Sequence, residues 1–190
     1  MHIGLIGGIG PKATSFYYQR IVQLFGAAAK PLSLTIVHTD IGLLAKNMAS
    51  GNADAQASEY RRVTDQLVGA GADSVAITSL GGAFCADQFA QISPLPIMDG
   101  PTAMAQHLRE TAVTRVGILG TTAVMGSKLY GKLHGVCEAL TPADDGDDAM
   151  AQAHADYAAL AMNGAATEQQ RECGTRSDAS PLALPHPEYN

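Results

Sequence analysis

The sequence has no tryptophan and few aromatic residues of any kind, with four phenylalanines and six tyrosines among 190 residues. We therefore expect a core built from alanine, valine, isoleucine, leucine and methionine. Lysine and arginine are also scarce and never clustered, and the net charge is −6. Because binding to phosphate backbones needs clustered cations, this composition argues against a nucleic-acid partner.

Long apolar runs are missing as well, and the first residues do not have the pattern of a secretory signal. No apolar run approaches the ~18 residues that cross a bilayer, and the apolar start MHIGLIGG has no cationic segment before it. We therefore expect no membrane partner and interpret residues 2–6 as a strand, not as a signal peptide. Cys85, Cys137 and Cys173 have no metal-ligand spacing, which favours reduced thiols in a cytoplasmic protein without a bound metal.

Short apolar runs alternate with longer helical patterns along most of the chain. This alternation predicts an α/β fold, with a parallel sheet, helices on both of its faces and right-handed crossovers. The expected strands are 2–6, 32–38, 73–78, 95–98, 115–119 and 136–140. The expected helices are 14–26, 53–70, 83–91, 102–111, 123–133 and 147–162.

Two segments repeat the same pattern of a strand, a glycine turn and a helix with tyrosine: HIGLIGGIGPKATSFYYQRI from His2 and RVGILGTTAVMGSKLYGKLH from Arg115. The repeat predicts a first flavodoxin-like lobe over residues 1–98 and a second, incomplete lobe over 99–170. Residues 171–190 lose the apolar periodicity and hold three prolines in the last ten positions, which predicts an irregular tail. An incomplete lobe leaves a strand edge or apolar face uncovered, so we expect a homo-oligomer, most simply a dimer.

The glycines after the first strand form a candidate anion site. Successive backbone N–H groups at the start of a helix favour a carboxylate or a phosphate. The segment from Gly8 to Ala13 also fits a G-x-G-x-x-A dinucleotide pattern, with Asp40 as the acidic residue. However, Asp40 lies further along than is usual, and Pro11 removes one N–H from the turn. A dinucleotide-binding oxidoreductase is therefore the weaker alternative.

Three segments, in this order along the chain, resemble the aspartate/glutamate racemase family and its aspartate-racemase branch: GLIGGIGPKAT with FYYQRI, GADSVAITSLGGAFCADQF, and RVGILGTTAVMGSKLYGKL. The resemblance covers residues 2–140. It implies a racemase of two similar α/β lobes that uses no cofactor and acts on a small amino or carboxylic acid. In this family one cysteine from each lobe faces the substrate Cα.

The chain departs from the family pattern at the catalytic groups. When this chain is aligned with the family segment at the shared Ala-Asp pair, residues 86–87, Ser79 takes the position of the first cysteine and Ala83 that of a histidine. A serine without a base is a poor proton acceptor, although it can donate a hydrogen bond to a carboxylate. Cys85 is the alternative catalytic thiol, but a small buried hydrophobe is the commoner role of a free cysteine.

No counterpart of the family's second cysteine turn is recognisable, and we therefore expect impaired racemisation of aspartate or glutamate. A carboxylate-binding relic of the family is the alternative. Helix capping is an equally good explanation for the threonines that follow the glycine turns. The residues expected to bind the carboxylate are Gly8, Gly10, Thr14, Gly81, Gly82, Thr121 and Thr122.

Overall fold

The computed structural model describes residues 1–8 and 10–163. The first lobe is built on a three-stranded parallel sheet of order β2-β1-β3, formed by β1 (His2–Gly7), β2 (Ser33–His38) and β3 (Ser74–Ile77). In the central strand β1, every residue after His2 is buried. Such a continuous apolar run is typical of a strand that is covered on both faces of a parallel sheet.

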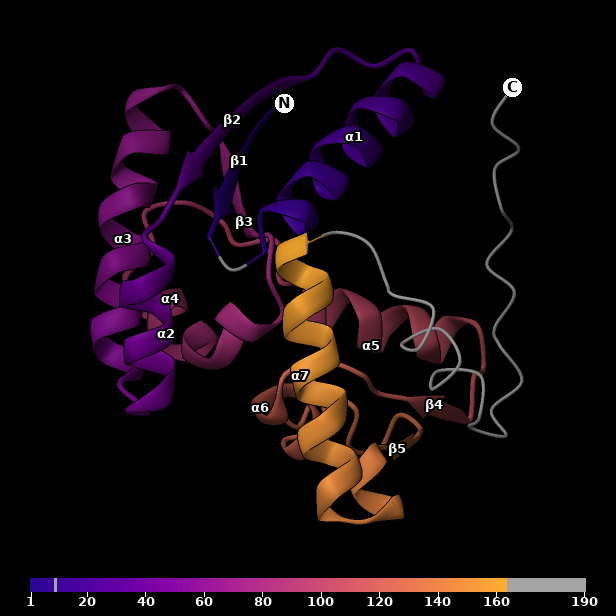
Figure 1. Cartoon of the computed structure of the whole chain (residues 1–190). Helices are drawn as coiled ribbons and strands as arrows, with labels where there is room; N and C mark the ends of the chain where they lie inside the picture. Colours follow the sequence, from indigo (N-terminus) through magenta and orange to yellow (C-terminus); the bar gives the residue numbers. More distant parts are fainter. Residues whose placement is uncertain (9, 164–190) are drawn as a thin grey trace.

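Helices cover the two faces of this sheet (Figure 1). Helix α1 (Pro11–Ala27) lies on one side, and α2 (Ile41–Ala49), α3 (Ala53–Gly69) and α4 (Ala86–Ile92) lie on the other. Helix α3 buries Tyr60, Val63 and Leu67, a helical spacing that gives one continuous apolar face. A Cβ at Gly4 would lie 2.8 Å from Leu67 Cδ1, so the missing side chain allows α3 to pack directly on β1.

The second lobe contains a two-stranded parallel sheet, β4 (Arg115–Gly117) with β5 (Glu138–Leu140). Helices α5 (Gly100–Glu110), α6 (Thr122–Gly126) and α7 (Asp147–Asn163) surround it, and it has its own core cluster. Two short 3-10 segments, η1 (Gly81–Cys85) and η2 (Pro142–Asp145), complete the described elements. The α/β class with parallel sheets is thus confirmed, whereas the incompleteness of the second lobe and the lobe boundaries stay predictions.

The expected strand 95–98 is reduced to a single parallel bridge between Val75 and Ile97. Val75 N–H donates to Pro96 O, and Met98 N–H donates to Val75 O. Proline has no N–H to give to a ladder, so Pro94 and Pro96 prevent a longer pairing. The segment still continues the strand order beyond β3, as in a flavodoxin-like sheet.

Two helix predictions also differ from the structure. The expected helix 123–133 ends at Gly126, because Lys128, Leu129, Tyr130 and Gly131 adopt left-handed φ values of 48°, 60°, 54° and 73°. Conversely, no helix was expected at α2. The predicted tail 171–190, and Cys173 within it, lie outside the described residues.

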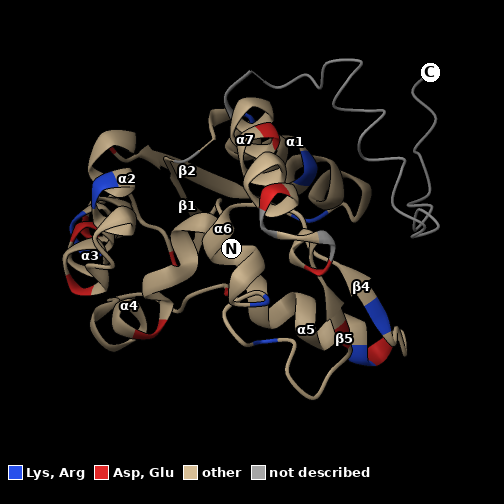
Figure 2. Ribbon diagram, turned by 60° about the horizontal axis from the view of Figure 1, so that its bottom comes forward, with Lys and Arg blue, Asp and Glu red and all other residues tan. Residues whose placement is uncertain are grey.

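Helix α7 extends from the second lobe to the first, where its end packs against α1 (Figure 1). Lys and Arg are scattered over the ribbon without gathering on one element (Figure 2). No helix within the described residues has the length and apolarity needed to cross a membrane.

Candidate functional site

The predicted residues of the first lobe lie at the carboxyl ends of β1 and β3, where ligands collect in open α/β sheets. Thr14 Oγ1 is 2.8 Å from Thr78 Oγ1, and Thr78 Oγ1 donates to Ile6 O at 3.0 Å. Since a hydroxyl has one hydrogen, Thr14 donates to Thr78. Thr14 therefore joins α1 to the strand ends, and it is Gly10 that occupies the N-cap position of α1.

The glycine turn after β1 is closely covered. Gly10 has a φ of 78°, and a Cβ at this position would lie 3.5 Å from Ala161 Cβ of α7. A Cβ at Gly8 would collide with the Thr39 hydroxyl, which donates to Gly7 O at 3.0 Å. The turn expected to bind a carboxylate is thus in contact with α7 on one side and with Thr39 on the other.

Ser79 lies two residues after the end of β3 and is half-buried. Its Oγ accepts a long hydrogen bond of 3.4 Å from Gly82 N, so its own proton is free to be donated. Tyr17, Asp99 and Ser79 are among the residues that line a hollow of about 20 Å³, which we call the Ser79 hollow. A space of this size holds one water molecule and no amino acid.

Two tyrosines fix the backbone just after Ser79. Tyr60 of α3 donates to Gly82 O, and Tyr130 of the second lobe donates to Gly81 O, each at 3.2 Å. A Cβ at Gly82 would collide with the Tyr60 hydroxyl, which explains why the turn needs glycine there. The bond from Tyr130 also connects the two lobes.

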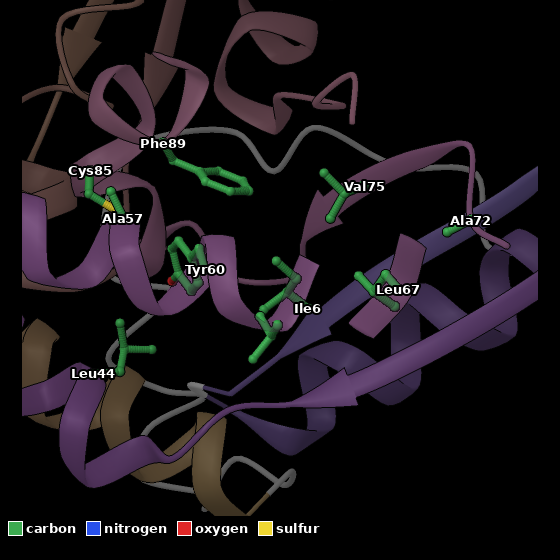
Figure 3. Close-up of a cluster of buried hydrophobic side chains, with 10 residues drawn as sticks. Ile6, Leu44, Ala57, Tyr60, Leu67, Ala72, Val75, Cys85 and Phe89 are labelled. Carbon is green, nitrogen blue, oxygen red and sulfur yellow. The ribbon is translucent and has the colours of Figure 1, made fainter. Parts of the chain in front are cut away.

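Cys85 is completely buried in the core cluster of the first lobe, among Ala57, Tyr60 and Phe89 (Figure 3). Its Sγ lies 3.8 Å from Gly82 O. Burial raises the pKa of the Cys85 thiol to about 12, and a protonated thiol is neither a base nor a nucleophile. This packing agrees with the role of a small buried hydrophobe, and a catalytic role for Cys85 stays a prediction that the packing disfavours.

Thr121 and Thr122 of the second lobe form hydrogen bonds with other residues of this chain. Thr121 Oγ1 accepts from Val124 N at 3.3 Å and caps α6, so the capping interpretation accounts for this hydroxyl. Thr122 N–H donates to His154 Nδ1 of α7 at 3.0 Å. His154 carried no motif in the sequence, because the contact depends on where α7 packs. The carboxylate-binding role of Thr121 and Thr122 stays a prediction.

The model of the family described as Asp/Glu/hydantoin racemase matches residues 6–135. The chain belongs to this family. The match includes the glycine turn, Ser79, η1 and the Thr121 turn, and ends before α7. The predicted resemblance is thereby confirmed at the level of the family.

Solved structures of this racemase family share the fold. A proposed Asp/Glu racemase from Yersinia pestis superposes with a TM-score of 0.73 and 24% identity, over 92% of this chain and 77% of that one. An aspartate racemase homologue from Pyrococcus horikoshii OT3 superposes with a TM-score of 0.65 and 21% identity, over 76% of this chain and 65% of that one. The aspartate racemase of Picrophilus torridus superposes with a TM-score of 0.69 and 17% identity, over 90% of this chain and 72% of that one. No curated protein sequence matches the chain.

Racemisation by two bases needs proton-transfer groups on opposite faces of Cα, each within hydrogen-bonding reach or through one water. Among the described residues of this racemase-family chain, the sequence-predicted candidates are the hydroxyl of Ser79 and the buried thiol of Cys85. Asp99 borders the Ser79 hollow, but its carboxylate caps α5 through Thr102 N at 3.2 Å. The described part of the site therefore offers a hydrogen-bond donor more readily than a base.

Proposed function

We propose that this chain is a cytoplasmic isomerase of the aspartate/glutamate racemase type that needs no pyridoxal phosphate and has impaired proton transfer at Cα. Its substrate is a small amino or carboxylic acid. The observation that carries the proposal is the place of Ser79: a half-buried hydroxyl at the carboxyl end of β3, facing the junction of two lobes in a racemase fold. There it can donate a hydrogen bond to a substrate carboxylate.

Binding at Ser79 requires a motion, because the Ser79 hollow admits about one water. The hydrogen bond from Tyr130 to Gly81 connects the lobes near this point. A net contribution of about 0.5–1.5 kcal/mol is typical of such a bond. Separation of the lobes to admit a ligand would break this bond and the contacts of α7 with α1.

A carboxylate-binding relic without catalysis is the second candidate, and the position of α7 favours it. His154 accepts the Thr122 N–H, and Ala161 lies against the Gly10 turn. Both contacts use or cover groups that a substrate carboxylate would otherwise meet. The oxidoreductase alternative has less support, because the Asp40 carboxylate accepts from Leu43 N at 2.8 Å and caps α2.

The test is α-proton exchange in deuterated water across a panel of amino acids, followed by chiral chromatography of aspartate, glutamate and alanine. The native chain is expected to racemise these amino acids slowly or not at all. Ser79→Ala is expected to lose carboxylate binding, and Ser79→Cys is expected to exchange the α-proton faster than the native chain. Ser74→Ala is the matched control, since Ser74 is a half-buried serine at the other end of β3. Robust native turnover that Cys85→Ala abolishes would show that Cys85 is the catalytic thiol, and micromolar binding of NAD would support the oxidoreductase.

We also propose that a second copy of the chain covers α1. None of the 17 residues of this helix is buried. Phe16 and Leu24, eight residues apart and therefore on one side of the helix, expose 66% and 51% of their surfaces, and the helix carries Lys12 and Arg20 but no acidic residue. An apolar face of this kind is typical of a protein contact. Light scattering of the purified chain measures the expected dimer directly.

A further inference from the structure

A second cavity lies at the junction of the lobes and adjoins the Ser79 hollow, with which it shares the lining residues Ala83, Ala86, Asp99 and Pro101. It has a volume of about 140 Å³ and is formed where η1 and α4 of the first lobe meet the start of α5 and the left-handed turn at Tyr130. We call it the junction pocket. None of the nine residues predicted to bind or transform a substrate lines it. An apolar cavity of ~150 Å³ is known to hold benzene, so a ligand of about six heavy atoms fits.

Charges of both signs line the junction pocket. Asp87, Asp99 and Lys132 are among the residues that line it. Among the described residues, ion pairs join Arg61 to Asp65, Arg62 to Glu59 and Arg115 to Glu138, and none joins Lys132 to Asp87 or Asp99. The three charges therefore border one cavity without neutralising each other directly.

This arrangement selects the chemistry of a ligand. Two carboxylates repel a phosphate or a dicarboxylate, and they attract an ammonium group, which donates three hydrogen bonds. The single lysine attracts one carboxylate. A metal ion has less support, since no three metal-ligating side chains come together within the described residues. A molecule with one ammonium and one carboxylate group fits both parts of the lining.

We propose that the junction pocket binds a small amino acid as its zwitterion, with the ammonium group at Asp87 and Asp99 and the carboxylate at Lys132. The ligand connects the lobes, because Asp87 belongs to α4 and Lys132 follows the left-handed turn of the second lobe. The same turn holds Tyr130, which donates to Gly81 O two residues after Ser79. An amino acid in the junction pocket therefore stabilises the closed arrangement of the lobes at the Ser79 hollow.

The test uses the full chain and follows backbone amide signals by NMR during titration with glycine and L-alanine. The amides of Gly131 and Lys132 are expected to shift. Methylammonium and acetate each carry one of the two charged groups of the amino acid. Each is expected to bind at least about tenfold more weakly than glycine, because a hydrogen bond to a charged group is lost. Equal binding of methylammonium and glycine would overturn the zwitterion assignment, as would the absence of shifts with every amino acid.

Substitutions locate the site. Lys132→Met and Asp87→Asn are each expected to weaken amino-acid binding at least about tenfold, and Asp99→Asn acts in the same direction while keeping a good helix cap. Lys128→Met is the matched control, because Lys128 lies in the same turn but does not line the pocket. Ser79→Ala is expected to leave this binding unchanged. Loss of binding in Ser79→Ala with retention in Lys132→Met would refute the junction pocket and place the ligand at Ser79 instead.

Discussion

The close approach of Gly82 to Tyr60 predicts strong coupling between two substitutions. A Cβ at Gly82 would collide with the Tyr60 hydroxyl and would lie 3.3 Å from Ile77 Cγ2. Gly82→Ala therefore forces a shift of buried groups, and overpacking of this kind costs about 1–3 kcal/mol of unfolding free energy. Tyr60→Phe removes the hydroxyl that donates to Gly82 O and leaves a buried carbonyl with a weaker partner, which costs about 1–3 kcal/mol.

The double variant tests whether the collision is real. Without the hydroxyl oxygen, the new Cβ finds room beside the phenyl ring, so the double variant is expected to be at least ~1 kcal/mol more stable than the sum of the single changes predicts. Urea unfolding followed by circular dichroism gives the three free-energy differences. The pair Gly69→Ala and Tyr60→Phe is the comparison, because a Cβ at Gly69 meets no atom within 4 Å and has no collision to relieve. Additivity within ~0.5 kcal/mol for Gly82 and Tyr60 would refute the reasoning.

Three further outcomes are expected. With the other two cysteines replaced by serine, Cys85 should react with a thiol reagent at pH 7 only after unfolding, since burial raises its pKa to about 12; fast native labelling would contradict its place in the core. The N–H of His2 donates to Asp73 and lowers the pKa of that carboxyl. Because the pKa of Asp73 is lower in the folded than in the unfolded chain, its carboxylate stabilises the fold at pH values above the unfolded pKa of ~3.9, and this contribution is lost as the pH falls through the folded pKa. In denaturant titrations, Asp73→Asn should therefore lose stability at pH 7 but not at pH 2. Phe16→Asp should convert a dimer into a monomer in light scattering, whereas Val68→Asp, at another exposed apolar residue on α3, should not. An unchanged dimer in Phe16→Asp would exclude the α1 face.

The strands and helices of the first lobe were largely predictable, because local patterns carry the information. The apolar run of β1 and the helical spacing on α3 both follow directly from burial. Helix α2 was missed although its signal is local: Asp40 caps it through Leu43 N. Asp40 was considered only as the acidic residue of the weaker dinucleotide alternative, whereas an N-cap is the commoner role of an aspartate at such a position.

The candidate site was harder to predict, since its contacts join residues far apart in sequence. Thr14 meets Thr78 across 64 positions, and Tyr130 meets Gly81 across 49. Neither the pairing of β1 with β3 nor the position of the second lobe is encoded in a local pattern. The left-handed turn at Tyr130 was missed for the same reason: three of its residues are not glycine, and tertiary contacts must hold them in a conformation that such residues rarely adopt.

The bond from Tyr130 to Gly81 has a consequence for the rate of ligand binding. Association at the Ser79 hollow follows the separation of the lobes, so its observed rate constant should level off as the ligand concentration rises. The junction pocket has room for a small ligand in the closed arrangement, so binding there needs no separation of the lobes. Its observed association rate constant should rise linearly with the ligand concentration. Stopped-flow measurements on one chain would then show two time courses, and the slower one would report how often the lobes open.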